Sequence, residues 1–187
     1  MSKQNNSTKV ITGPDTRFSY VHAWEPVAIE GSSPKYSVSL LIPKSDTRTV
    51  ERIRSAIKAA YDAGESKLRG SNGKIPSLDM IKQPLRDGDL ERDDEAYKGH
   101  WFLNSNSTSQ PGIVDGTCQP ILDRGELYSG CYGRASITFY AYSNNGSKGI
   151  ACGLNHLQVL RKGEPLGGRS SAEADFATDE DDEDFLT

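Results

Sequence analysis

The chain has 187 residues, 35% of them hydrophobic, and carries 22 Lys and Arg against 26 Asp and Glu. This length suits one domain with appendages. No segment approaches the roughly 18 consecutive apolar residues that a membrane span requires, and the polar N-terminus lacks the apolar core of a secretory signal. We therefore expect a protein that stays in the compartment where it is made, with no membrane contact.

The cysteines and histidines do not indicate a disulfide framework or a metal site. Three widely spaced cysteines are present, and a disulfide framework needs an even and denser set. No CxxC pair occurs, and the three histidines lack ligand spacing with the cysteines. We expect reduced thiols, no metal and no cofactor. The cysteines are Cys118, Cys131 and Cys152.

The charges are unevenly distributed along the chain. From Glu164 onward there are nine acidic residues and one basic residue, which gives that segment a net charge of −8. Residues 1–163 carry +4. A basic body joined to an acidic end indicates a nucleic-acid partner and an interaction tail.

Alternating apolar and polar residues predict two strands near the N-terminus. The first covers residues 16–24, where Phe18, Tyr20 and Trp24 share one face and are assigned to the core. The second covers residues 34–42, where Lys35 lies on the polar face.

One amphipathic helix is predicted over residues 47–63, after the helix-capping segment 43–46. Its outer side is basic, which suits either solvent or DNA. The next segment, residues 64–97, is polar and rich in Gly and Pro, and it predicts a long excursion with at most one short helix.

The second half of the chain again predicts strands, at 99–104, 113–114, 131–142 and 148–160, and Asn144-Asn145-Gly146 predicts a hairpin turn. The fold class is mainly β: a small barrel of the OB type with one amphipathic helix, the long excursion and a disordered acidic C-terminal tail. We assign residues 1–162 to the domain and 163–187 to a linker and the tail.

The strand over 131–142 carries the clearest binding signal. Alternation turns Gly133, Ala135, Ile137, Phe139 and Ala141 inward. The opposite face carries three tyrosines and an arginine, on which bases could stack and phosphates could bind. The alternative is that the excursion or a homodimer interface covers this face. The predicted DNA-binding residues on it are Tyr132, Arg134, Tyr140 and Tyr142.

Three further side chains are candidates for DNA contact. Lys35 and Lys148 could each meet a phosphate, and each could equally be solvated. Trp101 and Phe102 are adjacent, so that alternation sends them to opposite faces, one to the core and the other to a possible platform; we assign Trp101 to the DNA-binding set.

The tail has a pattern of its own. Six consecutive carboxylates, 179–184, precede Phe185 close to the end of the chain. A polyanion of this kind could occupy the basic groove when DNA is absent, and the aromatic could anchor it on a replication protein of phage or host. A solubilising tail is the alternative. The predicted partner-binding residues are Asp181, Asp182, Glu183, Asp184 and Phe185.

Four segments resemble a family of phage proteins that was first catalogued as a domain of unknown function and later recognised as single-stranded DNA-binding proteins with an OB fold. They are PKYSVSLLIPK (34–44), PLRDGD (84–89), YSGCYGR (128–134) and GIACGL (149–154), and the resemblance covers most of residues 8–176. The tail also resembles those of bacterial and T7-type single-strand binding proteins, which end on the aromatic itself, whereas Leu186 and Thr187 follow here. The resemblance implies a protein that coats single strands without sequence preference in phage replication, recombination or repair, in the cytoplasm of the bacterial host.

Two other functions are alternatives to strand coating. A metal-dependent nuclease would need rigidly held carboxylates, and the acidic residues of the excursion are interleaved with arginines, which favours loop charges that compensate one another. We therefore predict no enzyme. A strand-annealing mediator would use the same groove, and stacking alone would also admit RNA. The acidic residues in question are Asp87, Asp89, Asp93, Asp94 and Glu95.

Overall fold

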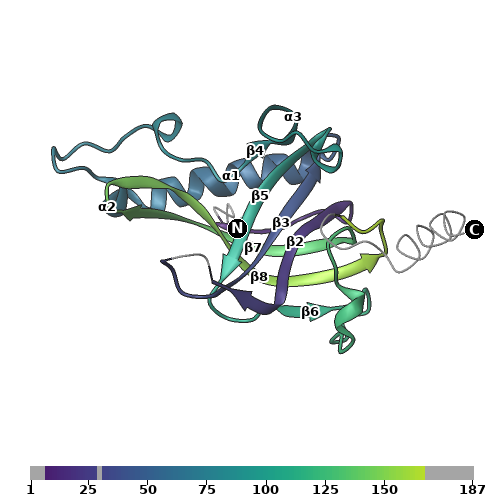
Figure 1. Ribbon diagram of the computed structural model, residues 1–187. Helices are drawn as coiled ribbons and strands as arrows, with labels where there is room; N and C mark the ends of the chain where they lie inside the picture. Colours follow the sequence, from purple (N-terminus) through teal and green to yellow (C-terminus); the bar gives the residue numbers. More distant parts are fainter. Residues whose placement is uncertain (1–6, 29–30, 167–187) are drawn as a thin grey trace, which may run out of the picture.

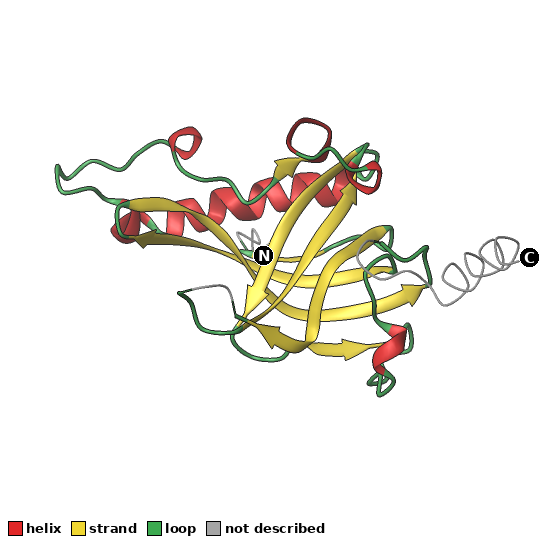
Figure 2. Cartoon of the chain, viewed as in Figure 1, coloured by secondary structure: helices red, strands yellow, loops and turns green. Residues whose placement is uncertain are grey.

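The computed structural model describes residues 7–28 and 31–166 as a mainly β protein with one long helix (Figures 1 and 2). Its strands are β1 (Lys9–Ile11), β2 (Thr16–Val27), β3 (Lys35–Pro43), β4 (Arg86–Asp87), β5 (His100–Ser107), β6 (Gly112–Val114), β7 (Tyr132–Asn144) and β8 (Ser147–Arg161). Its helices and 3-10 turns are α1 (Thr47–Ala63), α2 (Glu65–Leu68), η1 (Leu78–Met80), α3 (Gly88–Glu91), η2 (Glu95–Tyr97) and η3 (Arg124–Glu126). None of these helices has the length and apolar character of a membrane span.

Five strands close into a barrel. The sheet follows the order β7-β2-β3-β5-β8, and the pairing of β7 with β8 joins its two ends. All of these pairings are antiparallel except β5 with β8, which is parallel. This order of a five-stranded Greek-key barrel is that of the OB fold, which confirms the predicted class.

The core lies between the inner faces of the strands and α1. Residues 133, 135, 137, 139 and 141 of β7 are all buried, as the alternation predicted. Helix α1 adds the apolar side that carries Val50, Ile53 and Ile57. Asp46 caps this helix by accepting hydrogen bonds from the Thr49 backbone N–H at 3.2 Å and the Thr49 hydroxyl at 2.6 Å. The predicted helix and its start are therefore confirmed.

A bulge in β2 overturns one core assignment. Ser19 pairs with Ser39 and His22 with Ser37, so that three steps on β2 match two on β3. The extra residue reverses the alternation, and Tyr20 has a positive φ of 47°. Phe18 is fully buried and Trp24 packs against the core as predicted, but Tyr20 is 56% exposed and points outward. The assignment of Tyr20 to the core was wrong.

The excursion between α1 and β5 is more ordered than the sequence predicted. It holds two short helices, two 3-10 turns and β4, which pairs with β5. Leu68, Ile81 and Tyr97 are buried anchors along it. As a result its last part, residues 86–97, lies against the barrel next to the outer faces of β3 and β5.

The other connections agree with the sequence signals. The hairpin loop between β7 and β8 is formed by Asn145 and Gly146, both with positive φ, as the Asn-Asn-Gly signal predicts. After β8 the chain stays close to the barrel, because the Leu166 N–H donates to the Ser129 carbonyl at 2.8 Å. The predicted tail from residue 167 on lies outside the described residues, and the domain boundary at 162 stays a prediction.

Candidate nucleic-acid interface

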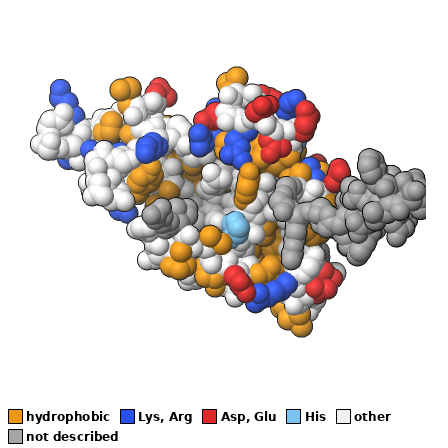
Figure 3. Space-filling view, viewed as in Figure 1, with side chains coloured by type: hydrophobic (Ala, Val, Ile, Leu, Met, Phe, Trp, Pro, Cys, Tyr) orange, Lys and Arg blue, Asp and Glu red, His pale blue; other side chains and the backbone are white. Residues whose placement is uncertain are grey.

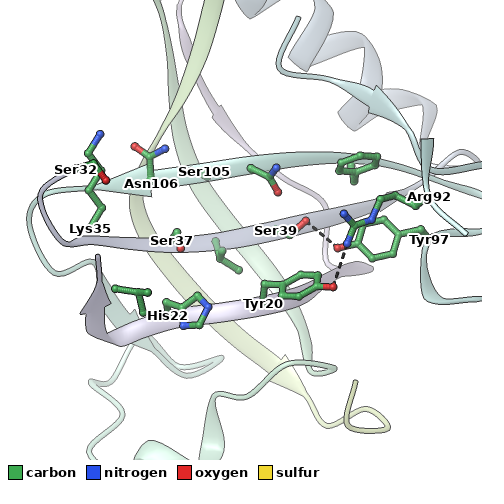
Figure 4. Close-up of a pocket in the computed structure, with 14 residues that line it drawn as sticks. Tyr20, His22, Ser32, Lys35, Ser37, Ser39, Arg92, Tyr97, Ser105 and Asn106 are labelled. Atoms are coloured by element: carbon green, nitrogen blue, oxygen red, sulfur yellow. Dashed lines mark hydrogen bonds between the residues drawn. The ribbon is translucent and has the colours of Figure 1, made fainter. Parts of the chain in front are cut away.

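A groove with a volume of about 580 Å³ lies on the outer face of β2, β3 and β5 (Figure 4). Its lining comes from these three strands, from the β2–β3 connection and from the end of the excursion. The lining residues are Tyr20, His22, Val27, Ser32, Lys35, Ser37, Val38, Ser39, Arg92, Tyr97, Phe102, Asn104, Ser105 and Asn106. In OB folds this outer face of the second and third barrel strands is the surface that binds oligonucleotides and oligosaccharides.

Small polar residues form the floor of the groove, because the pairing register aligns them in rows. One row joins Ser19, Ser39 and Asn104, and the next joins Ser37 and Asn106. Residues that pair across neighbouring strands point to the same side of a sheet. The floor therefore offers hydroxyl and amide groups that can donate to and accept from base edges.

Arg92 and Tyr20 form the cationic and aromatic end of the groove. The Arg92 guanidinium carbon lies 4.7 Å from the centre of the Tyr97 ring and 5.5 Å from that of Tyr20. Arg92 also donates from Nη2 to the Tyr20 hydroxyl at 3.1 Å. Figure 4 shows these three side chains turned toward one another at one end of the pocket, and Lys35 at the other end.

Tyr97 holds the excursion on the sheet. It is buried, its ring meets Phe102 edge-on with 5.1 Å between ring centres, and its hydroxyl lies 3.2 Å from the Ser39 hydroxyl and 3.5 Å from that of Ser19. Because both serines are buried, this hydroxyl supplies a partner that water cannot. Tyr97 therefore fixes the end of the groove from which Arg92 projects.

Ion pairs with a lysine also hold the end of the excursion, residues 86–97, on the barrel. Lys44 Nζ lies 2.7 Å from Asp87 Oδ1 and 2.8 Å from Asp89 Oδ2. Hydrogen bonding to Lys44 lowers the pKa of both carboxyl groups, and the same bonds raise the pKa of Lys44. The Gly99 N–H donates to Asp89 as well, which ties the segment to the start of β5.

The charges in the groove all have one sign. Its lining includes Lys35 and Arg92 but neither Asp nor Glu, although the chain has more acidic than basic residues. Among the described residues, no ion pair involves Lys35 or Arg92. On the face in Figure 3, Lys and Arg side chains also predominate at the left, over α2 and the β7–β8 hairpin. An anionic ligand would meet uncompensated positive charge in this groove.

Three predicted binding residues lie on the outer surface of the barrel, one of them in the groove. Lys35 lines the groove at the start of β3. Tyr140 is 43% exposed on the outer side of β7. Tyr142 is half-buried on the same side, and its hydroxyl reaches over Gly149. Lys148 has another partner, because its Nζ donates to the Leu68 carbonyl at 3.0 Å.

The remaining predicted residues do not join a common platform. Arg17 and Arg161 lie over the Tyr132 ring, with guanidinium carbons 5.2 and 4.3 Å from its centre. Arg134 donates to the Gln158 side chain at 2.8 Å. Residues 132 and 142 are ten positions apart on one strand, which is about 33 Å at 3.3 Å per residue. The tyrosines of β7 are therefore spread along the barrel.

Trp101 and Phe102 lie on opposite faces of β5, as their adjacency predicted. Trp101 packs against the main core, and the cations of Lys44 and Arg54 lie 5.2 and 5.0 Å from its ring centre. Phe102 faces the groove and is buried beneath Tyr97. The sequence selected Trp101 for the DNA-binding set, whereas Phe102 is the one of the pair that lines the groove.

Four of the five acidic residues named for the nuclease alternative have partners within the protein. Asp87 and Asp89 bind Lys44, Asp94 accepts from the Ala96 N–H, and Glu95 pairs with Lys98. Within residues 7–28 and 31–166, no group of three or more His, Cys, Asp and Glu side chains is arranged to hold a metal ion.

Comparison with known proteins identifies the family. A model described as the single-stranded DNA-binding protein of Enterobacter phage Enc34 matches residues 8–186. The chain belongs to this family. A protein of Acyrthosiphon pisum secondary endosymbiont phage 1, described as putative protein p50, is 34% identical over 169 residues, which is 85% of this chain and 88% of that protein.

Solved structures of phage proteins share the fold. The Enc34 single-stranded DNA-binding protein in complex with single-stranded DNA superposes with a TM-score of 0.66 at 24% identity, over 89% of this chain and 97% of that one. The gp2.5 single-stranded DNA-binding protein of bacteriophage T7 gives a TM-score of 0.60 at 14% identity, over 91% and 99% of the two chains. The resemblance of the sequence to phage single-strand binding proteins is thus confirmed.

Sequence patterns did not identify most of the residues that line the groove. Tyr20 was assigned to the core, and the polar segment gave no reason to select Arg92 or Tyr97. The outward Asn104 and Asn106 could have been found, because alternation from the buried Leu103 places them on the polar face of β5. The predicted tail residues 181–185 lie outside the described part of the chain.

Proposed function

We propose that the protein binds single-stranded DNA, without sequence preference, in the groove on the outer face of β2, β3 and β5. The observation that carries the proposal is the lining of that groove: the exposed ring of Tyr20 and the cationic side chains of Lys35 and Arg92, with no carboxylate. Aromatic faces stack on any base, and Arg and Lys meet the phosphates. Membership of a phage single-strand binding family supports the same ligand.

Three side chains have distinct roles in this proposal. Tyr20 provides a stacking surface, since more than half of its area is exposed. Arg92 binds a phosphate or stacks on a base at the closed end of the groove, and Lys35 binds a phosphate at the other end. The Ser and Asn floor hydrogen-bonds to base edges of any identity through groups that can rotate or offer both donors and acceptors.

Fluorescence titration of oligo-dT, with a matched duplex and a matched oligo-U, across a salt series tests this function. We expect salt-sensitive binding of the single strand with a log–log slope of about −0.7 per phosphate contact, and much weaker binding of the duplex. Equal affinity for the duplex would contradict the proposal. The comparison with oligo-U measures the preference for DNA over RNA.

We further propose that binding is not coupled to catalysis. Four of the five carboxylates considered for a nuclease site, those of Asp87, Asp89, Asp94 and Glu95, are held by Lys44, Lys98 and a backbone N–H. Incubation of end-labelled single strands with the protein and magnesium should leave their length unchanged. Accumulation of shorter products that depends on magnesium would contradict this.

Finally, we propose that the protein coats single strands during phage replication, recombination or repair in the host cytoplasm, and that residues 173–187 compete with DNA and recruit replication proteins. Charge complementarity supports competition, because six consecutive carboxylates belong to the same chain as a groove without acidic lining. The alternative role, that of a strand-annealing mediator, is tested by measuring whether the protein accelerates annealing of complementary oligonucleotides. Sedimentation with and without DNA tests whether the protein forms a homodimer.

A further inference from the structure

The outer face of the barrel continues beyond the groove to Tyr140. The register joins His22 to Ser37, Ser37 to Asn106, Asn106 to Gly153, and Gly153 to Thr138. These residues form one outward row across β2, β3, β5, β8 and β7, because paired residues share a face. Tyr140 lies two positions beyond the end of this row on the same side of β7.

The groove has one end from which a strand can leave along this row. Arg92 and Tyr97 stand at the end nearest Ser39, where Tyr97 is fastened to the floor. Lys35 and Asn106 lie at the opposite end (Figure 4). A chain that lies on the floor therefore leaves past Asn106, where the next outward residue is Gly153.

Packing does not explain the glycine at position 153. A Cβ there would lie 3.4 Å from the Thr138 carbonyl oxygen and 3.6 Å from Tyr140 Cε1, which are ordinary contacts, and its φ is not in the left-handed region. By contrast, a Cβ at Gly149 would lie 2.8 Å from Lys82 Cβ, and one at Gly133 would collide with the Gln158 carbonyl. A glycine inside a strand often marks a bulge, a bend at a barrel corner, or the close approach of a ligand or another backbone. The register of β7 and β8 shifts at Asn155, whereas Gly153 pairs with Thr138 in the regular register beyond that shift, so the bulge itself does not include Gly153.

Tyr140 is suited to be the surface that such a ligand reaches. Its ring is 43% exposed next to the open position at Gly153. An unperturbed tyrosine, with a pKa of about 10, is already neutral at physiological pH, so the phenol does not repel phosphates. Partial burial raises the pKa of Tyr140 further. A stacked base would cover the exposed ring.

We propose that Gly153 is the crossing point at which single-stranded DNA leaves the groove, passes over β8 and stacks a base on Tyr140. The inference rests on the proposed function and adds a path and a second stacking position to it. Gly153 acts as a positioning residue, since it leaves room for the chain and offers no contact group of its own.

The test compares Gly153→Val, Tyr140→Ala and the double variant in titrations with oligo-dT of about 4 and about 16 nucleotides, the range of site sizes of OB folds. Valine fits the strand and places two methyl groups on the path. Gly116→Val is the matched control, because a Cβ at Gly116 meets only the Leu160 side chain, at 3.4 Å. Gly153→Ala is a second, milder variant, and thermal unfolding checks that each protein folds.

In the full-length protein, we expect Gly153→Val and Tyr140→Ala each to weaken binding of the long oligonucleotide by about 5- to 150-fold, the range for loss of one stacked base. The double variant should bind the long oligonucleotide as tightly as the single variant with the lower affinity, because both substitutions remove the same contact. The affinity ratio between long and short oligonucleotides should fall, Gly153→Ala should lie between wild type and Gly153→Val, and Gly116→Val should match wild type.

Three results would overturn the crossing point. They are wild-type affinity of Gly153→Val for the long oligonucleotide, additive losses in the double variant, or an unchanged affinity ratio. If wild-type protein binds neither oligonucleotide, the proposed function itself has failed. If wild-type protein binds both oligonucleotides but substitutions at position 153 do not change affinity, only the proposed path over β8 is refuted.

Discussion

Replacing Arg92 by alanine tests the part of the groove that the sequence did not reveal. The guanidinium lies over Tyr97 and Tyr20 and has no carboxylate partner among the described ion pairs, so its charge is available to a phosphate. A hydrogen bond to a charged group contributes about 1.5–3 kcal/mol, and its loss weakens binding by about 10- to 150-fold. Loss of the cation–π contacts should lower the free energy of unfolding by only about 0.5–2 kcal/mol.

The assay is a salt series with oligo-dT, which separates charge from packing. Arg92→Ala should reduce the log–log salt slope by about 0.7 for each phosphate contact removed. Arg92→Lys should keep the slope but remain weaker than wild type, because lysine keeps the charge and loses the planar stacking surface. Arg124→Ala is the matched control, since Arg124 pairs with Glu25 and does not line the groove. An unchanged affinity and slope for Arg92→Ala in a folded protein would refute the role of Arg92.

Three further predictions concern stability and the tail. Tyr97→Phe should lower the free energy of unfolding in urea by about 1–2 kcal/mol, because two buried serine hydroxyls lose their partner; an unchanged midpoint would contradict this. Lys44→Met should be less stable than wild type above about pH 4, the range in which the unfolded chain's aspartates are ionised. Because Lys44 lowers the folded pKa of Asp87 and Asp89, this difference should shrink as the pH falls through those lowered values, and a difference that grows with acid would be inconsistent with the assignment. Deletion of residues 173–187 should tighten binding of oligo-dT, most at low salt, and equal affinities with and without these residues would argue against competition by the tail.

The barrel was readable where local pattern and tertiary packing agree. In β7 the residues that alternation turns inward, 133, 135, 137, 139 and 141, are all buried. In β3 the predicted inward residues Val38, Leu40 and Ile42 are buried too, although Ser39 and Leu41 on the opposite face are buried as well. Helix α1 has an N-cap aspartate, a periodic apolar side and Gly64 at its end, and all three signals are local. For these elements the sequence carries the information within a few residues.

The residues of the groove could not be predicted in the same way, because contacts between residues distant in sequence determine their positions. A single extra residue in β2 turned Tyr20 outward, and only its pairing with β3 reveals that residue. Arg92 and Tyr97 come from a polar segment whose position depends on two serines and a lysine more than 40 residues earlier in the chain. Likewise the sequence predicted that Tyr132 stacks on bases, but it did not show that the guanidinium groups of Arg17 and Arg161, distant in the chain, lie close to its ring.

Photo-crosslinking of bromodeoxyuridine-substituted oligonucleotide to the full-length protein, mapped by mass spectrometry, tests most directly whether the groove is the binding surface. We predict crosslinks to Tyr20 and His22 in the groove, and to Tyr140 with longer oligonucleotides. Crosslinks confined to the basic outer side of α1, around Arg48 and Arg52, with none in the groove, would contradict the account.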